Sequence, residues 1–232
     1  MQIEGSVALV TGASRGIGLA FARALRSRGA ATVYAGVRQP GTFDEPGLEP
    51  LLLDVTSQQD IDAAAVTASR ASIVINNAGI VAGPQLMDGS LDGARLEMEV
   101  NYFGPWAVSR AFAPVLAANG GGVLVNMLSV ASWRSNSRFP SYAASKAAEW
   151  SLTNALRVAL REQGTLVIAV HAGFVDTDAI RGLDVPKVPA TEVADKTMDA
   201  ITRNEPEVLV DETARRVRSQ LSGPLDLLYP AQ

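Results

Sequence analysis

The chain has 232 residues, a formal net charge of −4, 47% hydrophobic residues and no cysteine, and its mean hydropathy is +0.13. The acidic balance argues against nucleic-acid binding, which requires a basic surface, and a chain without cysteine has no disulfide framework and no thiolate metal site. No apolar run approaches the roughly 20 residues that span a bilayer, and no basic leader precedes the first apolar run. We therefore expect a cytoplasmic protein without a membrane partner, folded as one domain over residues 1–232.

A short strand, a glycine-rich turn and a helix are predicted at the start of the chain. Val7–Val10 is a continuous apolar run, typical of a strand buried on both faces, and apolar residues recur at helical spacing from Leu19 to Gly29. Between them lies Thr11-Gly-Ala-Ser-Arg-Gly-Ile-Gly18. Glycines let the backbone approach a ligand, and the N–H groups of a helix N-terminus bind phosphate. A tight turn without a ligand has the same pattern, but this context favours a nucleotide.

The second predicted strand, Ala31–Val37, is followed by a basic residue. An acidic residue about 20 positions past the glycine turn would bind the ribose 2′-hydroxyl of NAD. Arg38 stands near that position instead, and Arg15 lies within the turn. Two guanidinium groups suit a 2′-phosphate. The sequence therefore predicts NADP(H) over NAD(H), with two solvated surface arginines as the alternative.

Two further strands are predicted before the middle of the chain. Leu51–Leu53 is a short strand that ends at Asp54. Ser72–Asn76 is an apolar strand that runs into Asn76-Asn-Ala-Gly79. The two amides at this strand end either bind a ligand or brace the neighbouring strands.

A long helical pattern covers residues 91–118 and is interrupted at Gly104-Pro105. Proline removes a helical hydrogen bond and disturbs the carbonyl four residues earlier, which is that of Asn101. The distortion either frees this carbonyl for a water molecule or is a packing kink.

The most informative stretch follows the fifth predicted strand, Val123–Leu128. Ser129 would lie at the carboxyl end of this strand, where open α/β sheets place their ligands. In the helix predicted over Pro140–Arg161, Tyr142 and Lys146 are four residues apart and share a face. A fixed cation favours phenolate and lowers the tyrosine pKa from about 10, so the phenol could exchange a proton with an alcohol or ketone. Alone, such a pair is usually a surface pair.

The C-terminal third continues the alternation of strands and helices. Thr165–Val170 is the sixth predicted strand, and His171 at its end is more typical of the core than of a catalytic base. Residues 172–177 are predicted as a loop, Ala190–Arg203 as a helix and Glu207–Asp211 as the seventh strand. The alternation predicts an α/β fold, a doubly wound parallel sheet of about seven strands with helices on both faces.

Taken together, these motifs resemble the classical short-chain dehydrogenase/reductase family. The glycine turn 11–18, Asn76-Asn-Ala-Gly79, Asn101, Ser129 and Tyr142-x-x-x-Lys146 occur in the family's order and approximate spacing. The resemblance covers nearly the whole chain and implies a Rossmann-type fold with the catalytic residues in the same domain.

The resemblance also implies a role for each residue of the site. Tyr142 would be the general acid or base, Ser129 would hydrogen-bond the substrate oxygen, and Asn101 would help to hold a water molecule. Lys146 would hold the nicotinamide ribose and lower the pKa of Tyr142. The implied cofactor site consists of Gly12, Ser14, Arg15, Gly16, Ile17, Gly18, Arg38, Asp54, Val55, Asn77, Ala78, Gly79, Tyr142, Lys146, Gly173, Val175 and Thr177.

The expected function is that of an NADP(H)-dependent oxidoreductase, a carbonyl reductase that interconverts a ketone or aldehyde and an alcohol. The substrate would be a small, apolar carbonyl or alcohol compound. The resemblance implies a homodimer or homotetramer that associates through the helices predicted at 91–118 and 140–161. A dinucleotide-binding sensor or scaffold with little turnover is the alternative, as is imine reduction or epimerisation at the same site.

Two features depart from the family pattern. Ala172 stands where the family usually has proline, and the segment 177–190 is short where many members carry a long lid over the substrate.

Four aromatic residues could line an apolar substrate pocket or belong to the core: Tyr102, Trp133, Phe139 and Phe174.

Overall fold

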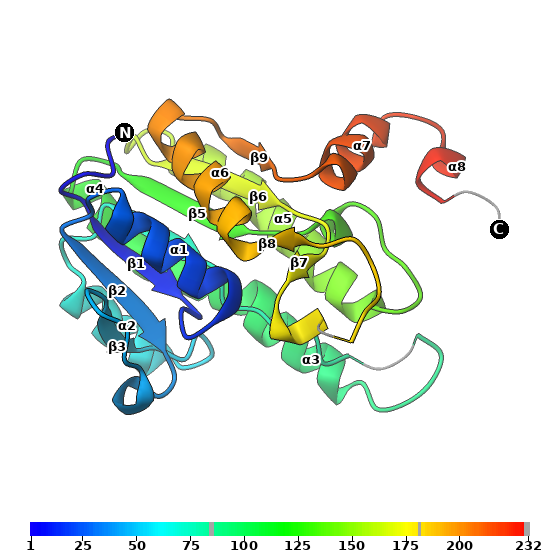
Figure 1. Cartoon of the computed structure of the whole chain (residues 1–232), viewed down its shortest axis with the longest axis horizontal. Coiled ribbons are helices and arrows are strands. Elements are labelled where there is room, and N and C mark those ends of the chain that lie inside the picture. The colour runs from blue at the N-terminus through cyan, green and yellow to red at the C-terminus, as the bar shows by residue number, and fades with distance from the viewer. Residues whose placement is uncertain (84–85, 181, 230–232) are drawn as a thin grey trace.

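The computed structural model describes residues 1–83, 86–180 and 182–229, and in this part of the chain seven strands form one parallel sheet (Figure 1). Their order across the sheet is β3-β2-β1-β4-β5-β6-β9. The strands are β1 Val7–Thr11, β2 Thr32–Val37, β3 Glu49–Leu52, β4 Ile73–Asn76, β5 Val123–Met127, β6 Leu166–His171 and β9 Glu207–Leu209. The order reverses between β1 and β4, which confirms the predicted doubly wound, Rossmann-type fold.

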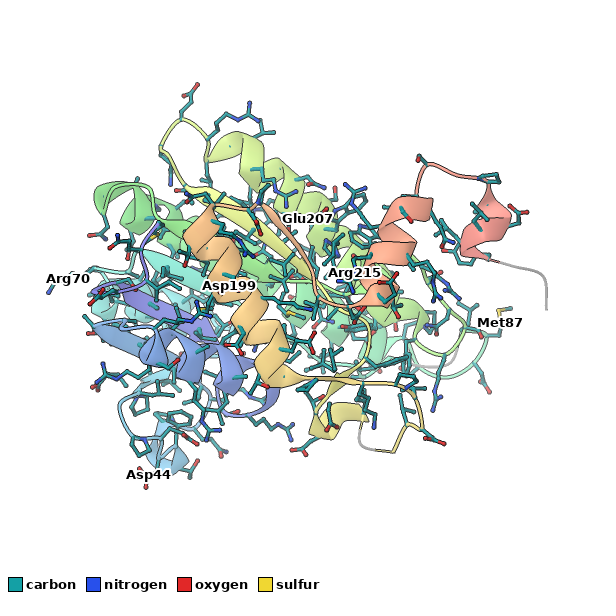
Figure 2. All side chains as sticks on the ribbon, turned by 45° about the horizontal axis from the view of Figure 1, so that its top comes forward. Asp44, Arg70, Met87, Asp199, Glu207 and Arg215 are labelled. Carbon is teal, nitrogen blue, oxygen red and sulfur yellow. The ribbon has the colours of Figure 1, made fainter. Side chains whose placement is uncertain are left out.

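Helices cover both faces of the sheet and bury its apolar strands. On one face α1 (Gly16–Ser27) packs beside α6 (Ala190–Arg203), and Arg28 Nη1 lies 2.9 Å from Asp199 Oδ1 between them (Figures 1 and 2). The opposite face is covered by α2 Gln58–Thr67, α4 Gly104–Ala118 and α5 Pro140–Ala159. Because every residue of β4 and β5 is buried, these strands have the continuous apolar pattern by which they were predicted.

The helical pattern over residues 91–118 is divided as the sequence predicted. It begins with α3 (Asp92–Met98), passes through a π-helical turn (Glu99–Phe103) and continues as α4. The Gly104 N–H donates to the Glu99 carbonyl, five residues back. Pro105, the next residue, has no N–H to offer to Asn101 four residues earlier. Whether the Asn101 carbonyl binds a water molecule stays a prediction.

The region predicted as a loop over residues 172–177 contains a short strand. β7 (Val175–Asp176) pairs in parallel with β8 (Val188–Pro189) in a separate two-stranded sheet. Strands of two residues have no alternating pattern, so sequence periodicity could not reveal them.

In the described part of the chain, the last two helices are α7 (Glu212–Gln220) and α8 (Leu225–Leu228), which the sequence patterns did not predict. The Asp211 side chain caps α7 by accepting a hydrogen bond from the Ala214 N–H at 2.7 Å. The last strand ends at Leu209, two residues earlier than predicted, where it pairs with His171, the last residue of β6. No helix in the described part of the chain combines the length and the apolarity that crossing a bilayer requires.

Candidate active site

The glycine turn lies at the carboxyl ends of β1 and β4, where the strand order reverses. Gly12 has a φ of +65°, which favours glycine. At Gly18, a Cβ atom would lie 2.2 Å from the Gly12 carbonyl oxygen and 2.5 Å from Asn77 Nδ2. The turn is therefore wrapped so tightly that no side chain fits at Gly18.

The amides after β4 brace this turn. The Asn77 and Ala78 N–H groups both donate to Thr11 Oγ1 at 3.0 Å, and Asn77 Nδ2 donates to the carbonyl oxygens of Thr11 and Gly12. Asn76 Nδ2 donates to Asn126 Oδ1 at 2.9 Å and so ties β4 to β5. Bracing, one of the two alternatives for these amides, accounts for their contacts.

The N-terminus of α1 presents backbone N–H groups at the same edge. Arg15 is the residue before the helix, and its side chain makes no capping hydrogen bond, so the first N–H groups of α1 remain available to an anion. Ser14 and Arg15 are exposed. A Cβ atom at Gly16 would lie 3.4 Å from the Thr177 methyl group, so Thr177 lies beside the turn.

Arg38 and Asp54 follow the neighbouring strands β2 and β3. Arg38 is exposed. Asp54 Oδ1 accepts hydrogen bonds from the N–H and hydroxyl of Thr56 at 2.9 and 2.7 Å. These bonds hold the pKa of Asp54 below its ordinary value, with a smaller contribution from the charge of Arg38. Val55 is buried and packs against Gly104, where a Cβ atom would lie 2.8 Å from the valine.

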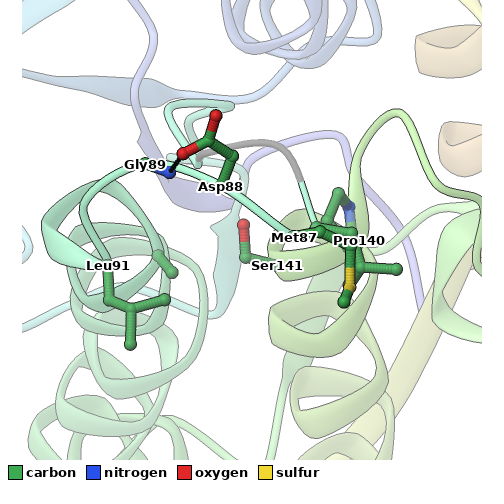
Figure 3. Close-up of a pocket in the computed structure, with 8 residues that line it drawn as sticks. Met87, Asp88, Gly89, Leu91, Pro140 and Ser141 are labelled. Carbon is green, nitrogen blue, oxygen red and sulfur yellow. Dashed lines mark hydrogen bonds between the residues drawn. The ribbon is translucent and has the colours of Figure 1, made fainter.

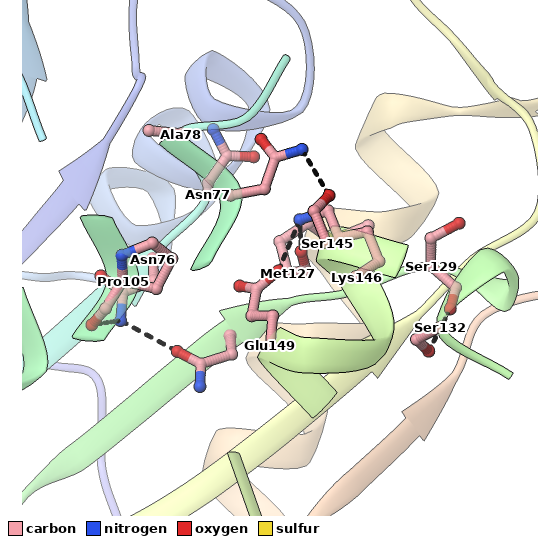
Figure 4. Close-up of polar contacts among 12 residues, drawn as sticks. Asn76, Asn77, Ala78, Pro105, Met127, Ser129, Ser132, Ser145, Lys146 and Glu149 are labelled. Carbon is pink, nitrogen blue, oxygen red and sulfur yellow. Dashed lines mark hydrogen bonds and ion pairs between the residues drawn. The ribbon is translucent and has the colours of Figure 1, made fainter. Parts of the chain in front are cut away.

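Lys146 is buried and bound on two sides (Figure 4). Its Nζ donates to the Met127 carbonyl at 2.8 Å and to Glu149 Oε2 at 2.7 Å. Burial would lower the pKa of Lys146, but the charges of Glu149 and Tyr142 outweigh it and raise that pKa above 10.5. The sequence patterns did not single out Glu149, although its place three residues after Lys146 puts it on the same helix face.

Asn101 and Gly79 lie next to this lysine. The buried Asn101 amide donates to Ser145 Oγ at 3.0 Å and to the Ile80 carbonyl at 2.9 Å, and its Oδ1 accepts from the Ile80 N–H at 2.8 Å. A Cβ atom at Gly79 would lie 3.3 Å from Asn101 Oδ1 and 3.8 Å from Lys146 Nζ. The structure thus brings together three residues that lie far apart in the sequence.

Ser129 and Tyr142 lie where β5 and α5 approach each other. Ser129 follows β5, and its hydroxyl accepts a hydrogen bond from the Ala131 N–H at 3.1 Å. An accepting hydroxyl keeps its own proton to donate. Tyr142 is half-buried in the first turn of α5, which packs against the 3₁₀ turn that begins after Ser129.

Gly173 and Val175, two members of the implied cofactor site, follow β6. The Gly173 N–H donates to Asp211 Oδ2 at 2.7 Å, and Val175 is buried in β7. The Asp211 carboxylate also caps α7, so it fixes the loop that begins with Ala172. The Asp211 carboxylate can thereby hold this loop in place although Ala172 stands where the family usually has proline.

His171 belongs to the core, as predicted. It is fully buried, and its ring stacks on Trp133 with centroids 3.6 Å apart. Its Nδ1 lies 3.2 Å from Ser132 Oγ. Trp133 also packs against Val217 and Leu228, so it is a core residue and not part of a substrate pocket.

The burial of His171 predicts a pH dependence of stability. Burial lowers the pKa of His171 to about 3, below its unfolded value of about 6.5. The resulting stability is fully present above pH 6.5 and is lost as the pH falls toward 3. At about 1.4 kcal/mol per pH unit, we expect wild type to lose about 4 kcal/mol more than His171→Gln between pH 6.5 and 3, measured by urea unfolding. If the free energy of unfolding falls equally in wild type and His171→Gln, His171 is not held neutral by burial.

Comparisons with known proteins identify the family. The short chain dehydrogenase family model matches residues 6–185. The 7alpha-hydroxysteroid dehydrogenase of Escherichia coli is 30% identical over 200 residues, which cover 81% of this chain and 78% of that protein. The chain belongs to the short-chain dehydrogenase family, and its relatives are oxidoreductases.

Two solved structures bear on the cofactor. A short chain dehydrogenase from Burkholderia cenocepacia in complex with NADP is 37% identical, with a TM-score of 0.93 over 99% of this chain and 98% of that one. A short chain dehydrogenase/reductase from Burkholderia phymatum in complex with NAD is 26% identical, with a TM-score of 0.80 over 95% of each chain. The family binds both dinucleotides, so the comparisons leave the preference open.

Proposed function

We propose that this protein is an NADP(H)-dependent oxidoreductase that interconverts a ketone or aldehyde and an alcohol, with Tyr142 as the general acid or base. Binding and chemistry would share one domain, residues 1–232. The observation that carries the proposal is that Lys146, Asn101 and Gly79 meet beside α5, whose first turn contains Tyr142 and which packs against the 3₁₀ turn that follows Ser129. A protein that only bound a dinucleotide would need no such set of proton-handling groups.

The turn fits the cofactor because its exposed residues, Ser14 and Arg15, lie directly before the N-terminus of α1. Gly18 leaves room only for hydrogen, and α1 presents its first N–H groups beside it. A pyrophosphate would bind there. Asp54 and Val55 would lie toward the adenine, and Gly79 with Lys146 toward the nicotinamide ribose.

The chain's own residues would orient the substrate and move a proton. When bound, the nicotinamide supplies or accepts the hydride. The Ser129 hydroxyl would donate a hydrogen bond to the substrate oxygen and fix its position. The Tyr142 phenol would give its proton to that oxygen during ketone reduction and take it back during alcohol oxidation. The Lys146 ammonium would hold the ribose through an N–H donor.

A mostly apolar pocket at the start of α5 supports an apolar substrate (Figure 3). Its volume is about 530 Å³, and Ser141, the neighbour of Tyr142, forms part of its wall. Apolar side chains line much of the rest: Leu86, Met87, Leu91, Ala94 and Pro140. Hydrophobic walls with few polar groups are typical of small-molecule sites.

Association into a homodimer or homotetramer stays a prediction. It is supported by large apolar side chains that are exposed on the helices predicted to form the contact, namely Leu96, Phe103, Trp106 and Val158.

The exposed arginines at the glycine turn and after β2 support NADP(H) over NAD(H). We expect Arg38→Leu to raise the Kd for NADPH at least about tenfold, because a charged hydrogen bond is worth about 1.5–3 kcal/mol. The Kd for NADH should change less than about twofold. Fluorescence titration with both cofactors measures this. Arg70→Leu is the control, since the exposed Arg70 precedes β4 at the opposite edge of the sheet (Figure 2). Equal weakening of both cofactors would contradict the assignment.

The proposed function is tested by following nicotinamide absorbance when the protein is mixed with NADPH or NADH and a panel of apolar ketones and aldehydes. NADPH-dependent turnover on one or more panel members supports it. Tight NADPH binding without turnover on any panel member would favour the alternative, a dinucleotide-binding sensor. If the protein binds neither NADPH nor NADH, the proposed function is refuted.

A further inference from the structure

Glu149 is a buried carboxylate held by one charged partner. Its side chain is 1% exposed and that of Lys146 is 5% exposed. Its Oε2 lies 2.7 Å from Lys146 Nζ, and within the described residues Lys146 is the one titratable group that acts on it. A carboxylate is rarely buried unless it is paired, because leaving water is unfavourable for a charge. A leucine at position 149 would fill the same buried helix face without the free-energy cost of removing a charge from water.

We propose that Glu149 is a positioning residue for the active site, which keeps the Lys146 side chain protonated and aims it at the ribose position. This inference rests on the proposed role of Lys146 in the cofactor site. Glu149 itself would touch neither the cofactor nor the substrate.

The hydrogen bonds of Lys146 support a positioning role. An ammonium group has three N–H donors and no acceptor. The Met127 carbonyl and the Glu149 carboxylate accept two of them, and together they fix the direction of the third. Gly79 lies on this side of the site, because a Cβ atom there would be 3.8 Å from Lys146 Nζ. One donor therefore remains for a ribose hydroxyl.

The charge of Glu149 determines whether the lysine stays an ammonium. Burial alone favours neutral lysine, and the Glu149 charge is the largest opposing contribution. Without that charge, Lys146 would lose its proton at a lower pH. Burial also raises the pKa of Glu149 to about 7, so the carboxylate is fully ionised only above about pH 8. The effect of replacing Glu149 on the Lys146 pKa and on cofactor binding should therefore be measured at alkaline pH.

Other titratable groups around the pair are neutral, fixed or exposed. On α5, Tyr142 also acts on Lys146. On β6, His171 is neutral because burial lowers its pKa to about 3. On α3, Glu97 is held by two backbone N–H groups at 2.8 and 2.9 Å. The 3₁₀ turn after Ser129 has no titratable side chain. The remaining titratable residues of α3 and the π-helical turn are exposed or half-buried: Asp92, Arg95, Glu99 and Tyr102.

The first test measures the pKa of Lys146 in the protein without cofactor. The chain has three lysines, Lys146, Lys187 and Lys196, so their side-chain ¹³C resonances are assigned by single substitutions and followed by NMR from pH 7 to 11. In Glu149→Gln, which keeps the shape and an acceptor oxygen, we expect the Lys146 pKa to fall by at least about one unit. In Glu149→Asp, which keeps the charge, we expect it to stay near the wild-type value.

A matched control removes the other Glu–Lys helix pair. Glu192 Oε1 lies 2.7 Å from Lys196 Nζ, with the side chains 40% and 39% exposed. Because solvent screens this pair, Glu192→Gln should shift the Lys196 pKa far less than Glu149→Gln shifts that of Lys146. If Glu149→Gln does not fold, the wild-type titration decides, since a Lys146 pKa below 10 would overturn the proposal.

The second test measures cofactor affinity in the same variants. The ratio of the Kd of Glu149→Gln for NADPH to that of wild type should be near one at pH 8 and should rise to about two- to threefold at pH 10, because a one-unit fall in a lysine pKa that lies just above 10.5 lowers the protonated fraction at pH 10 by about that factor. An unchanged Lys146 pKa in folded Glu149→Gln would overturn the positioning role. Wild-type protein that binds neither NADPH nor NADH would refute the proposed function instead, and the NMR result would still stand.

Discussion

Tyr142→Phe should abolish most of the turnover and leave cofactor binding intact. The substitution removes the phenolic oxygen that is proposed to exchange the proton, and a positioned general acid or base contributes about 10² to 10⁴ in rate. We expect kcat/KM for a responsive ketone to fall by about 10³-fold. The Kd for NADPH should remain within about threefold, because the ring stays in place at the start of α5.

The matched control for this substitution is Tyr102→Phe. Tyr102 lies in the π-helical turn, and its ring packs against Phe103 and Trp106. It should retain turnover within about twofold of wild type. Near wild-type kcat/KM in Tyr142→Phe would mean that another group moves the proton and that the proposed mechanism is wrong.

Gly18→Ala should impair both the fold and the cofactor site. The new Cβ atom would lie 2.2 Å from the Gly12 carbonyl oxygen, a backbone atom that cannot rotate away. Overpacking of this kind destabilises proteins by about 1–3 kcal/mol, and we expect the upper end of that range in urea unfolding. Because relief of the clash must displace the turn, the Kd for NADPH should rise about 100-fold in the folded fraction.

Gly41→Ala separates the clash from the general effect of replacing a glycine. Nothing lies within 4 Å of a Cβ atom at Gly41. This variant should keep wild-type stability within about 0.5 kcal/mol and bind NADPH normally. Equal behaviour of Gly18→Ala and Gly41→Ala would refute the tight wrapping of the glycine turn.

The fold could be predicted from sequence where burial imposes a pattern. The apolar runs of β4 and β5 and the spacing in α1 and α6 follow from burial on one or both faces. In contrast, α7 is largely polar, with Ala214 and Val217 as its buried residues. A helix with so few buried residues shows little hydrophobic periodicity in its sequence. In the structure α7 is stabilised by the Asp211 cap and by packing of Trp133 against Val217.

The site was predictable as a set of local motifs, but its long-range contacts were not. Tyr142 and Lys146 share a face by helix geometry alone. The Met127 carbonyl reaches Lys146 only because β5 packs against α5, and no local pattern encodes that approach. The pocket residues Leu86, Met87 and Leu91 lie in a segment without regular spacing. Glu149 was detectable, since it lies one helical turn after Lys146.

The most direct test of the central claim is transfer of deuterium from NADPH labelled at C4 of the nicotinamide ring. Wild-type protein would be incubated with each of the two C4-labelled stereoisomers and a responsive ketone, and the alcohol would be analysed by mass spectrometry. The account predicts that one isomer delivers deuterium to the carbinol carbon and that Tyr142→Phe suppresses the transfer. Alcohol formed without deuterium from either isomer would contradict direct hydride transfer at this site.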